Sequence, residues 1–141
     1  MDHYLDTSVI VSMIVTDAHT TKATTWFEKT EPRSLVSSFA KVEFAAIISR
    51  LVRTSRLSAA EGRRALDTFD TWLAGDAQLV NFSKDDIEAA DRMVRDFDTK
   101  LLAPDAIHLA VAKRLGATLI TFDTRLAAAA IIQNVSSQIP A

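Results

Sequence analysis

The chain has 141 residues, 48% hydrophobic and 24% charged, which fits a single globular domain over residues 1–141 and argues against disorder. It has no cysteine, which excludes disulfides, thiolate zinc sites and cysteine nucleophiles. Its 16 basic and 18 acidic side chains give a net charge of −2, so the molecule as a whole exerts no long-range attraction on nucleic acid. The acidic start and the short apolar runs predict a cytoplasmic protein that does not enter a membrane.

Short apolar runs alternate along the chain with longer segments of helical periodicity, and no repeat or linker divides them. Four runs predict strands, and a fifth predicts an edge strand, at about residues 3–6, 34–37, 77–82, 117–122 and 135–139. The segments between them predict helices at about residues 9–15, 17–30, 39–54, 58–75, 83–97, 103–115 and 124–130. Strands separated by helices are normally parallel, so we expect an α/β fold.

Apolar stripes and capping residues support these helices. The pattern around Ser58 and Glu61 is a capping box, and Gly75 and Gly116 are expected helix ends. Two helices carry residues at helical spacing that we expect to face the core, namely Phe39, Val42, Ala46 and Ile47 in the first and Ile87, Ala90, Val94 and Phe97 in the second.

Four carboxylates stand where the sequence is otherwise apolar. Asp6 ends the first predicted strand and Asp123 follows a later one, and ligands in parallel sheets bind at the carboxyl ends of the strands. Glu43 has apolar neighbours three and four residues away, and Asp105 opens an almost wholly apolar helix. Most other acids lie in polar stretches and are expected to serve solubility and capping, as in the set Asp85, Asp86, Glu88 and Asp91.

Structural explanations exist for two of the four. Asp6 is suited to cap a helix, and Asp105 in a first turn stabilises the helix dipole. Glu43 has no such explanation, because no lysine or arginine stands three or four residues away. If the sheet brings the four together, their repulsion requires protonation or a cation, and Mg²⁺ or Mn²⁺ is the cation that carboxylates favour.

Two hydroxyls and one histidine lie near these acids in the sequence. Ser8 follows Asp6 by two residues and Thr121 precedes Asp123 by two, so either is placed to hold a water molecule or a carboxylate oxygen. His108 follows Asp105 by one turn, and we interpret it as a packed histidine on an apolar helix. His3 and His19 have no spacing typical of metal ligands.

Arginines are concentrated between residues 50 and 64. This stretch contains a single acid, Glu61, and five arginines: Arg50, Arg53, Arg56, Arg63 and Arg64. They form a candidate phosphate-facing surface. The alternative is a solvated helix surface. Apolar side chains of the first helices, Met13, Ile14, Trp26 and Phe27, belong either to the core or to a protein-binding surface.

The acidic motifs carry a family resemblance. The segments Tyr4-Leu5-Asp6-Thr7-Ser8, Val42-Glu43-Phe44, Pro104-Asp105-Ala106-Ile107-His108 and Leu119-Ile120-Thr121-Phe122-Asp123 resemble the successive motifs of PIN domains, particularly VapC-type toxins of bacterial toxin–antitoxin pairs. Each motif is short, but the four occur in the family's order over nearly the whole chain.

The resemblance implies a three-layer α/β/α sandwich around a parallel sheet of four or five strands. It implies an Mg²⁺- or Mn²⁺-dependent ribonuclease with Asp6, Glu43, Asp105 and Asp123 as catalytic acids, and a cognate antitoxin as partner, in a homodimer or a toxin–antitoxin hetero-oligomer. A metal held by Asp6, Asp105 and Asp123 would lower the pKa of a bound water and neutralise charge on the phosphate. Glu43 would bind metal or steer the water. In such a ribonuclease, Arg50, Arg53 and Arg125, together with Lys41 and Lys100 near the acidic motifs, would contact the RNA backbone.

Two rival functions remain open. A receiver or haloacid-dehalogenase-like phosphatase also places an aspartate after its first strand, but the phosphatase pattern wants a second aspartate where this chain has Ser8. A PIN-like scaffold without activity is the second alternative, and the complete set of four acids argues against it.

Overall fold

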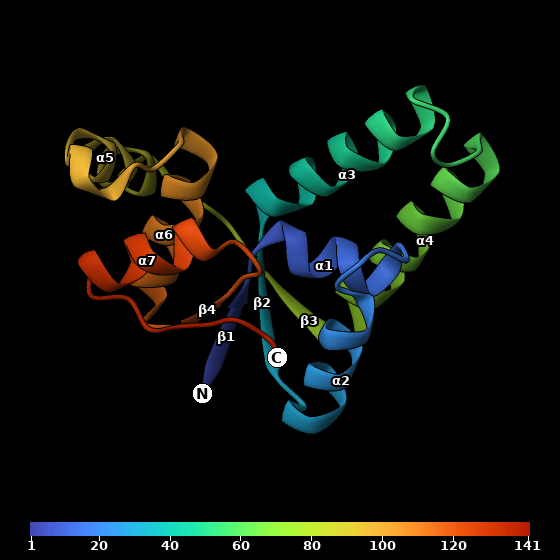
Figure 1. Ribbon diagram of the computed structural model, residues 1–141, viewed down its shortest axis with the longest axis horizontal. Coiled ribbons are helices and arrows are strands. Elements are labelled where there is room, and N and C mark those ends of the chain that lie inside the picture. Colours follow the sequence, from blue (N-terminus) through green and yellow to red (C-terminus); the bar gives the residue numbers. More distant parts are fainter.

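The computed structural model describes residues 1–141 as a five-stranded parallel sheet with helices on both faces (Figure 1). The strands, in sheet order β3-β2-β1-β4-β5, are β1 (Asp2–Leu5), β2 (Arg33–Ser37), β3 (Ala77–Val80), β4 (Thr118–Ile120) and β5 (Ser137–Gln138). The helices are α1 (Thr7–Ile14), α2 (Thr20–Thr30), α3 (Ser38–Arg53), α4 (Ala59–Asp76), α5 (Lys84–Arg95), the short η1 (Phe97–Thr99), α6 (Ala103–Leu115) and α7 (Thr124–Ile132). The predicted α/β/α sandwich is confirmed.

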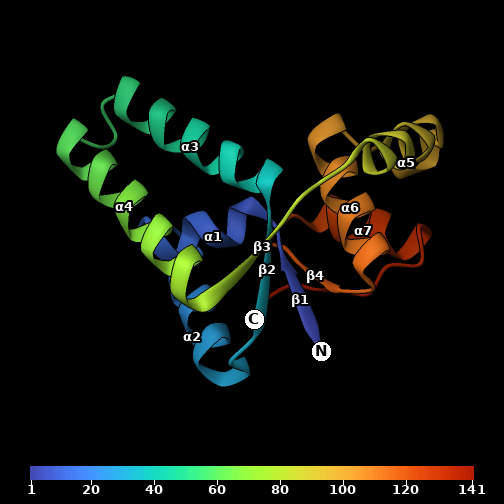
Figure 2. The same cartoon turned by 180° about the vertical axis from the view of Figure 1, so that it is seen from behind.

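The central strands send alternate side chains into two separate cores. Leu5, Val36 and Ile120 pack under α1 to α4, whereas their chain neighbours Tyr4, Leu35 and Leu119 pack under α5 to α7. Figures 1 and 2 show the two groups of helices on opposite sides of the sheet. Strands covered on both faces need consecutive apolar residues, which is why these segments appear in the sequence as short apolar runs.

Two predicted apolar stripes are wrong in detail. In α3 the buried residues are Ala40, Phe44 and Ile48, none of which belongs to the predicted set, and Val42 is 68% exposed. In the other stripe, only Ala90 is buried; Ile87 and Val94 are 43% and 38% exposed, and Phe97 lies beyond the end of α5 at 88% exposure. The helices themselves were predicted correctly, because a shifted apolar stripe keeps the helical period.

The ends of α4 and α6 lie where the capping residues in the sequence predict them. Ser58 and Glu61 form the predicted capping box, with each backbone N–H donating to the other's side chain at 3.0 and 2.9 Å. Gly116 ends α6 at a φ of 61°, a left-handed conformation that glycine adopts without strain. The expected end near Gly75 is confirmed to within one residue: α4 ends at Asp76 and leads directly into β3.

Helices α3 and α4 form a hairpin that projects from the sheet (Figure 1). The two helices approach closely at Gly62, where a Cβ atom would lie 2.5 Å from Val52 Cγ2.

No helix of the structure combines the length and the apolar character needed to span a bilayer.

Candidate active site at the carboxyl edge of the sheet

The four predicted acids come from elements that meet at one edge of the sheet. Asp6 follows β1, and its N–H donates to Ile120 O of β4 at 3.0 Å, so Asp6 and Thr121 are neighbours across two strands. Helix α3 begins where β2 ends and carries Glu43 in its second turn. Helix α6 leads back to the start of β4, so its first turn, with Asp105, lies at the carboxyl edge of the sheet.

Asp6 stands at the N-cap position of α1, but hydroxyl groups hold its side chain. The Ser8 and Thr121 hydroxyls both donate to Asp6 Oδ2, at 2.9 and 2.8 Å, and the side chain makes no capping hydrogen bond. The alternative of Asp6 as an N-cap is therefore correct for its position, while its carboxylate contacts the hydroxyls and not the helix. Asp6 Oδ1 has no hydrogen-bond donor, and the closest cation is His108, whose Nε2 lies 3.9 Å away.

Asp123 and Asp105 also leave oxygen atoms free. Asp123 Oδ1 accepts from the backbone N–H groups of Arg125 and Leu126 at 2.9 and 3.3 Å and so caps α7, while its second oxygen accepts no hydrogen bond. No donor contacts either oxygen of Asp105. Burial, together with the negative charges of Asp6 and Asp123, raises the pKa of Asp105 to about 6. The three acids therefore act electrostatically on one another.

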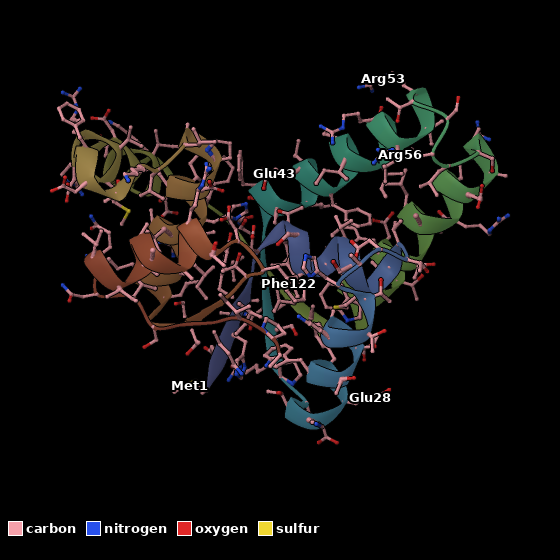
Figure 3. All side chains as sticks on the ribbon, viewed as in Figure 1. Met1, Glu28, Glu43, Arg53, Arg56 and Phe122 are labelled. Atoms are coloured by element: carbon pink, nitrogen blue, oxygen red, sulfur yellow. The ribbon has the colours of Figure 1, made fainter.

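Glu43 differs from the other three because it has strong donors. The Thr7 hydroxyl donates to Glu43 Oε1 at 2.8 Å, and His108 Nε2 contacts the same oxygen. Burial would raise the pKa of Glu43, but the hydrogen bonds from His108 and Thr7 outweigh it and lower the pKa. Figure 3 labels Glu43 at the root of α3, where the helix leaves the sheet.

His108 is buried as predicted, at 1% exposure, but its role in the site was missed. Burial would lower the pKa of its imidazole, but the hydrogen bond to Glu43 and the charges of Asp6 and Glu43 outweigh it and raise the pKa. Thr7, which also contacts Glu43, was missed as well. The sequence held one signal, since Glu43 lacks a cation on its own helix and so required one from elsewhere.

The donor chemistry suits a divalent cation. Carboxylate oxygens are ligands that Mg²⁺ and Mn²⁺ prefer, and no lysine or arginine forms an ion pair with Asp6, Glu43, Asp105 or Asp123. In their present positions, no three acids or histidines are close enough to form a ready metal site. The free oxygens of Asp6, Asp105 and Asp123, together with the lack of a lysine or arginine partner, are the features that suit a divalent cation.

The predicted RNA-binding arginines lie apart from the acids. Arg50 and Arg53 are exposed in the last turn of α3, and Figure 3 labels Arg53 at the far end of the hairpin from Glu43. The ten residues from Glu43 to Arg53 correspond to about 15 Å of helix. Arg125 is exposed in the first turn of α7, two residues after Asp123.

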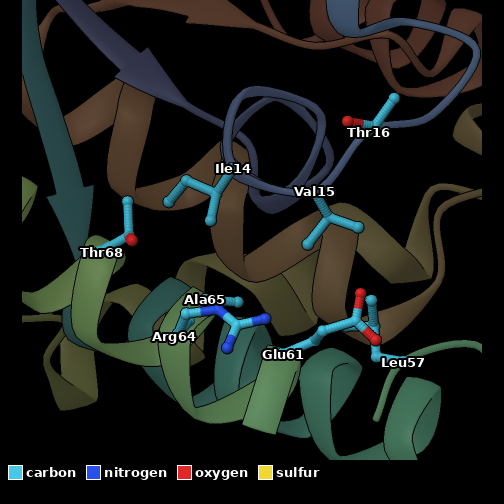
Figure 4. Close-up of a pocket in the computed structure, with 8 residues that line it drawn as sticks. All are labelled: Ile14, Val15, Thr16, Leu57, Glu61, Arg64, Ala65 and Thr68. Atoms are coloured by element: carbon cyan, nitrogen blue, oxygen red, sulfur yellow. The ribbon is translucent and has the colours of Figure 1, made fainter.

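A groove lies away from the acids, between the end of α1 and helix α4 (Figure 4). Its volume is about 430 Å³, and Ile14, Val15 and Leu57 provide an apolar lining beside Glu61 and Arg64. Trp26, by contrast, is 5% exposed and belongs to the core.

Three solved structures illustrate the likeness of this fold to known proteins. VapBC2 from Rickettsia felis, bound to a promoter DNA fragment, aligns with a TM-score of 0.73 at 17% identity, covering 99% of this chain and 98% of the other. VapC20 from Mycobacterium tuberculosis, a sarcin–ricin loop cleaving toxin, aligns with a TM-score of 0.73 at 21% identity, covering 91% and 95%. FitAcB from Neisseria gonorrhoeae aligns with a TM-score of 0.70 at 19% identity, covering 98% and 97%.

A search of curated protein sequences gave no match. The family model described as the PIN domain matches residues 3–132, a span that contains all four acids and both hydroxyls of the edge. The chain therefore belongs to the PIN domain family.

Proposed function

We propose that this chain is a divalent-metal-dependent ribonuclease, acting as the toxin of a toxin–antitoxin pair, with residues 1–141 as one catalytic domain. The observation that carries the proposal is the group of Asp6, Asp105 and Asp123 at the carboxyl edge of the sheet, where no lysine or arginine balances their charge. Membership of the PIN family and the likeness to VapC toxins support the same reaction class.

In this proposal the metal ligands are Asp6, Asp105 and Asp123, and the ion is Mg²⁺ or Mn²⁺. When bound, such an ion supplies positive charge for the scissile phosphate and lowers the pKa of water. Ser8 and Thr121 hold one oxygen of Asp6 and leave the other free to bind. Glu43, whose pKa is lowered, stays ionised and able to accept a proton or orient a water molecule.

The experiment is RNA cleavage by the purified chain, with total cellular RNA and a sarcin–ricin loop hairpin as substrates. We expect cleavage with Mg²⁺ or Mn²⁺, none with chelator, and none in Asp6→Asn. Asp2→Asn is the matched control, because Asp2 lies on the same strand at the opposite edge of the sheet, in an exposed ion pair with Arg33. Cleavage that persists in chelator or in Asp6→Asn contradicts the proposal.

Binding to an antitoxin is the second part of the proposal. The groove of Ile14, Val15 and Leu57 suits an apolar segment of an antitoxin, with Arg64 and Glu61 available for its charged residues. We expect the product of a neighbouring reading frame to co-purify with the chain and to inhibit cleavage. Val15→Glu should weaken that binding while cleavage by the free chain continues; unchanged binding would remove the groove from the proposal.

The scaffold and the phosphoryl-accepting domain give different results in the same assays. A scaffold binds a partner tightly and cleaves no RNA with any metal ion. A receiver-like domain is phosphorylated on Asp6 by a small phosphodonor. The free carboxylate oxygens at the edge favour the nuclease over the scaffold.

A further inference from the structure

A chain of buried hydrogen bonds leads from the start of α3 back to Glu43 on the same helix. Ser37, the N-cap of α3, accepts a hydrogen bond from the Ala40 N–H at 3.0 Å and lies 2.8 Å from the Tyr4 hydroxyl. The Tyr4 hydroxyl also lies 2.6 Å from His108 Nδ1, and His108 Nε2 contacts Glu43 Oε1. The chain thus links β2, β1, α6 and α3.

The interior of this chain of hydrogen bonds is closed to solvent. Tyr4 and Ser37 are 0% exposed and His108 is 1% exposed, while the Glu43 side chain at the end is 26% exposed. Burying so many polar atoms costs free energy unless each has a partner, and each of these atoms has one. An apolar residue at position 108 would pack in the same space at lower cost, so packing alone does not account for the histidine.

The direction of the hydrogen bond is fixed at the Glu43 end of this series. The pKa of Glu43 is lowered, so its Oε1 accepts, and His108 Nε2 must carry a proton to donate to it. At Nδ1 the hydroxyls of Tyr4 and Ser37 can point either way along the chain. In both arrangements the Nε2 proton is directed at Glu43.

We propose that His108, oriented by Tyr4, is a positioning residue that fixes the carboxylate of Glu43 at the carboxyl edge of the sheet. The inference rests on the proposed nuclease function, because it assigns His108 to the geometry of one of the catalytic acids. Without His108 the carboxylate keeps a single side-chain donor, the Thr7 hydroxyl at 2.8 Å. A glutamate has several rotatable bonds, so one donor leaves its carboxylate poorly oriented.

The test compares two substitutions of His108 in the RNA cleavage assay. His108→Leu removes both nitrogens, and kcat should fall about 100-fold, as for a misplaced catalytic group, with KM for RNA unchanged. His108→Gln keeps an N–H donor near the place of Nε2, so kcat should recover to within about fivefold of the wild type. Tyr4→Phe, which removes the hydroxyl that orients the ring, should give an intermediate kcat.

Ile48→Ala is the control for loss of stability, because Ile48 is buried in the same helix as Glu43 and touches none of this chain of hydrogen bonds. It should lower the free energy of unfolding while kcat of the folded protein stays unchanged. Equal kcat in His108→Leu and the wild type would overturn the proposal. So would equal losses in His108→Leu and His108→Gln, or in His108→Leu and Ile48→Ala.

A second readout needs no activity and separates this proposal from the nuclease function. Nitrogen-15 NMR of the imidazole should show a protonated, hydrogen-bonded Nε2 in the metal-free wild type, with that signal shifted in Glu43→Gln. If the wild type cleaves no RNA but the signal shifts, the nuclease proposal fails and the contact that orients Glu43 stands. An unprotonated Nε2, or an Nε2 signal that is unchanged in Glu43→Gln, would overturn the positioning role.

Discussion

Asp86 and Asp6 are the two carboxylates with less than a tenth of their surface exposed, at 1% and 7%, and their partners differ in kind. Asp86 accepts two hydrogen bonds from one guanidinium, from Arg114 Nε at 2.7 Å and Arg114 Nη2 at 2.9 Å, and a third from the Ser83 N–H at 2.9 Å. Burial would raise the pKa of Asp86, but these partners outweigh it and lower the pKa.

Asp6 is surrounded by hydroxyls and by further acids. It has two hydroxyl donors on one oxygen, and its negative charge is one of the causes that raise the pKa of Asp105. A guanidinium balances the charge of Asp86 and ties α5 to α6, whereas no lysine or arginine pairs with Asp6, Asp105 or Asp123. The comparison teaches that the partner of a buried carboxylate, more than its burial, separates a structural acid from a candidate ligand.

The largest expected effect concerns Asp105, which has no donor of its own. Asp105→Asn should lower kcat for RNA cleavage at least about 100-fold, because it removes charge and a ligand oxygen from the edge. Asp67→Asn, at an exposed position of α4, is the matched control and should leave kcat unchanged. Equal activity of the two variants would place Asp105 with the structural acids.

Removing the partner of Asp86 should affect stability and leave the chemistry intact. Arg114→Met leaves a buried carboxylate without its guanidinium, and we expect the free energy of unfolding to fall by about 2–3 kcal/mol, less than for a fully buried pair because Arg114 is partly exposed. Denaturant titration measures the loss. A normal kcat per folded molecule is expected, and a large drop in kcat would mean that the two acidic sites are coupled.

Removing the Asp105 charge should stabilise the fold, the opposite of the effect at Asp86. Its pKa is about 6 in the folded chain against 3.8 for an ordinary aspartate, so the native state binds the proton more tightly. This carboxyl therefore costs stability as pH rises from about 4 to about 6. Without metal, the free energy of unfolding of Asp105→Asn should exceed that of the wild type by about 1–2 kcal/mol at pH 7, after allowance for solvent screening.

The pH dependence of that difference is the check. The advantage of Asp105→Asn should shrink as pH falls from about 6 to about 4 and vanish below about pH 3, where the wild-type carboxyl is protonated in both states. A constant difference between pH 4 and pH 7 would show that the acids do not repel one another.

The smallest effect concerns the arginines at the far end of the α3–α4 hairpin. Arg53→Ser should raise KM for RNA by less than about tenfold and reduce the salt dependence of binding by about one phosphate contact, with kcat unchanged. The measurement is RNA binding at several salt concentrations. An unchanged salt slope would support the alternative that these arginines are only a solvated helix surface.

The fold was predictable because its signals are local. Apolar pairs such as Leu35 and Val36 indicated doubly covered strands, and Ser58 with Glu61 marked the start of a helix. The stripes in α3 and α5 were misassigned because neighbouring positions carry similar apolar residues, so which of them is buried depends on tertiary packing. Phe97 is the clearest case, since it continues the spacing of α5 but lies in η1 after the helix has ended.

The candidate site was predictable as far as its acids and hydroxyls. Ser8 and Thr121 were expected near the acids from period-two spacing, and both donate to Asp6. Contacts across the fold were not predictable, because no spacing links His108 to Glu43, 65 residues away, or Arg114 to Asp86, 28 residues away. Asp86 was expected only to serve solubility and capping; it does cap α5 through the Ser83 N–H, but its burial and its pairing with Arg114 were not predicted.

Calorimetric titration of Mn²⁺ into the RNA-free chain at pH 7 tests most directly whether the edge acids form a cation site. We expect binding to the wild type and to Asp67→Asn, its loss in Asp6→Asn, and weaker binding as pH falls through about 6, where Asp105 takes up a proton. Absence of binding to the wild type, or equal binding to Asp6→Asn, would contradict a metal site at the carboxyl edge of the sheet.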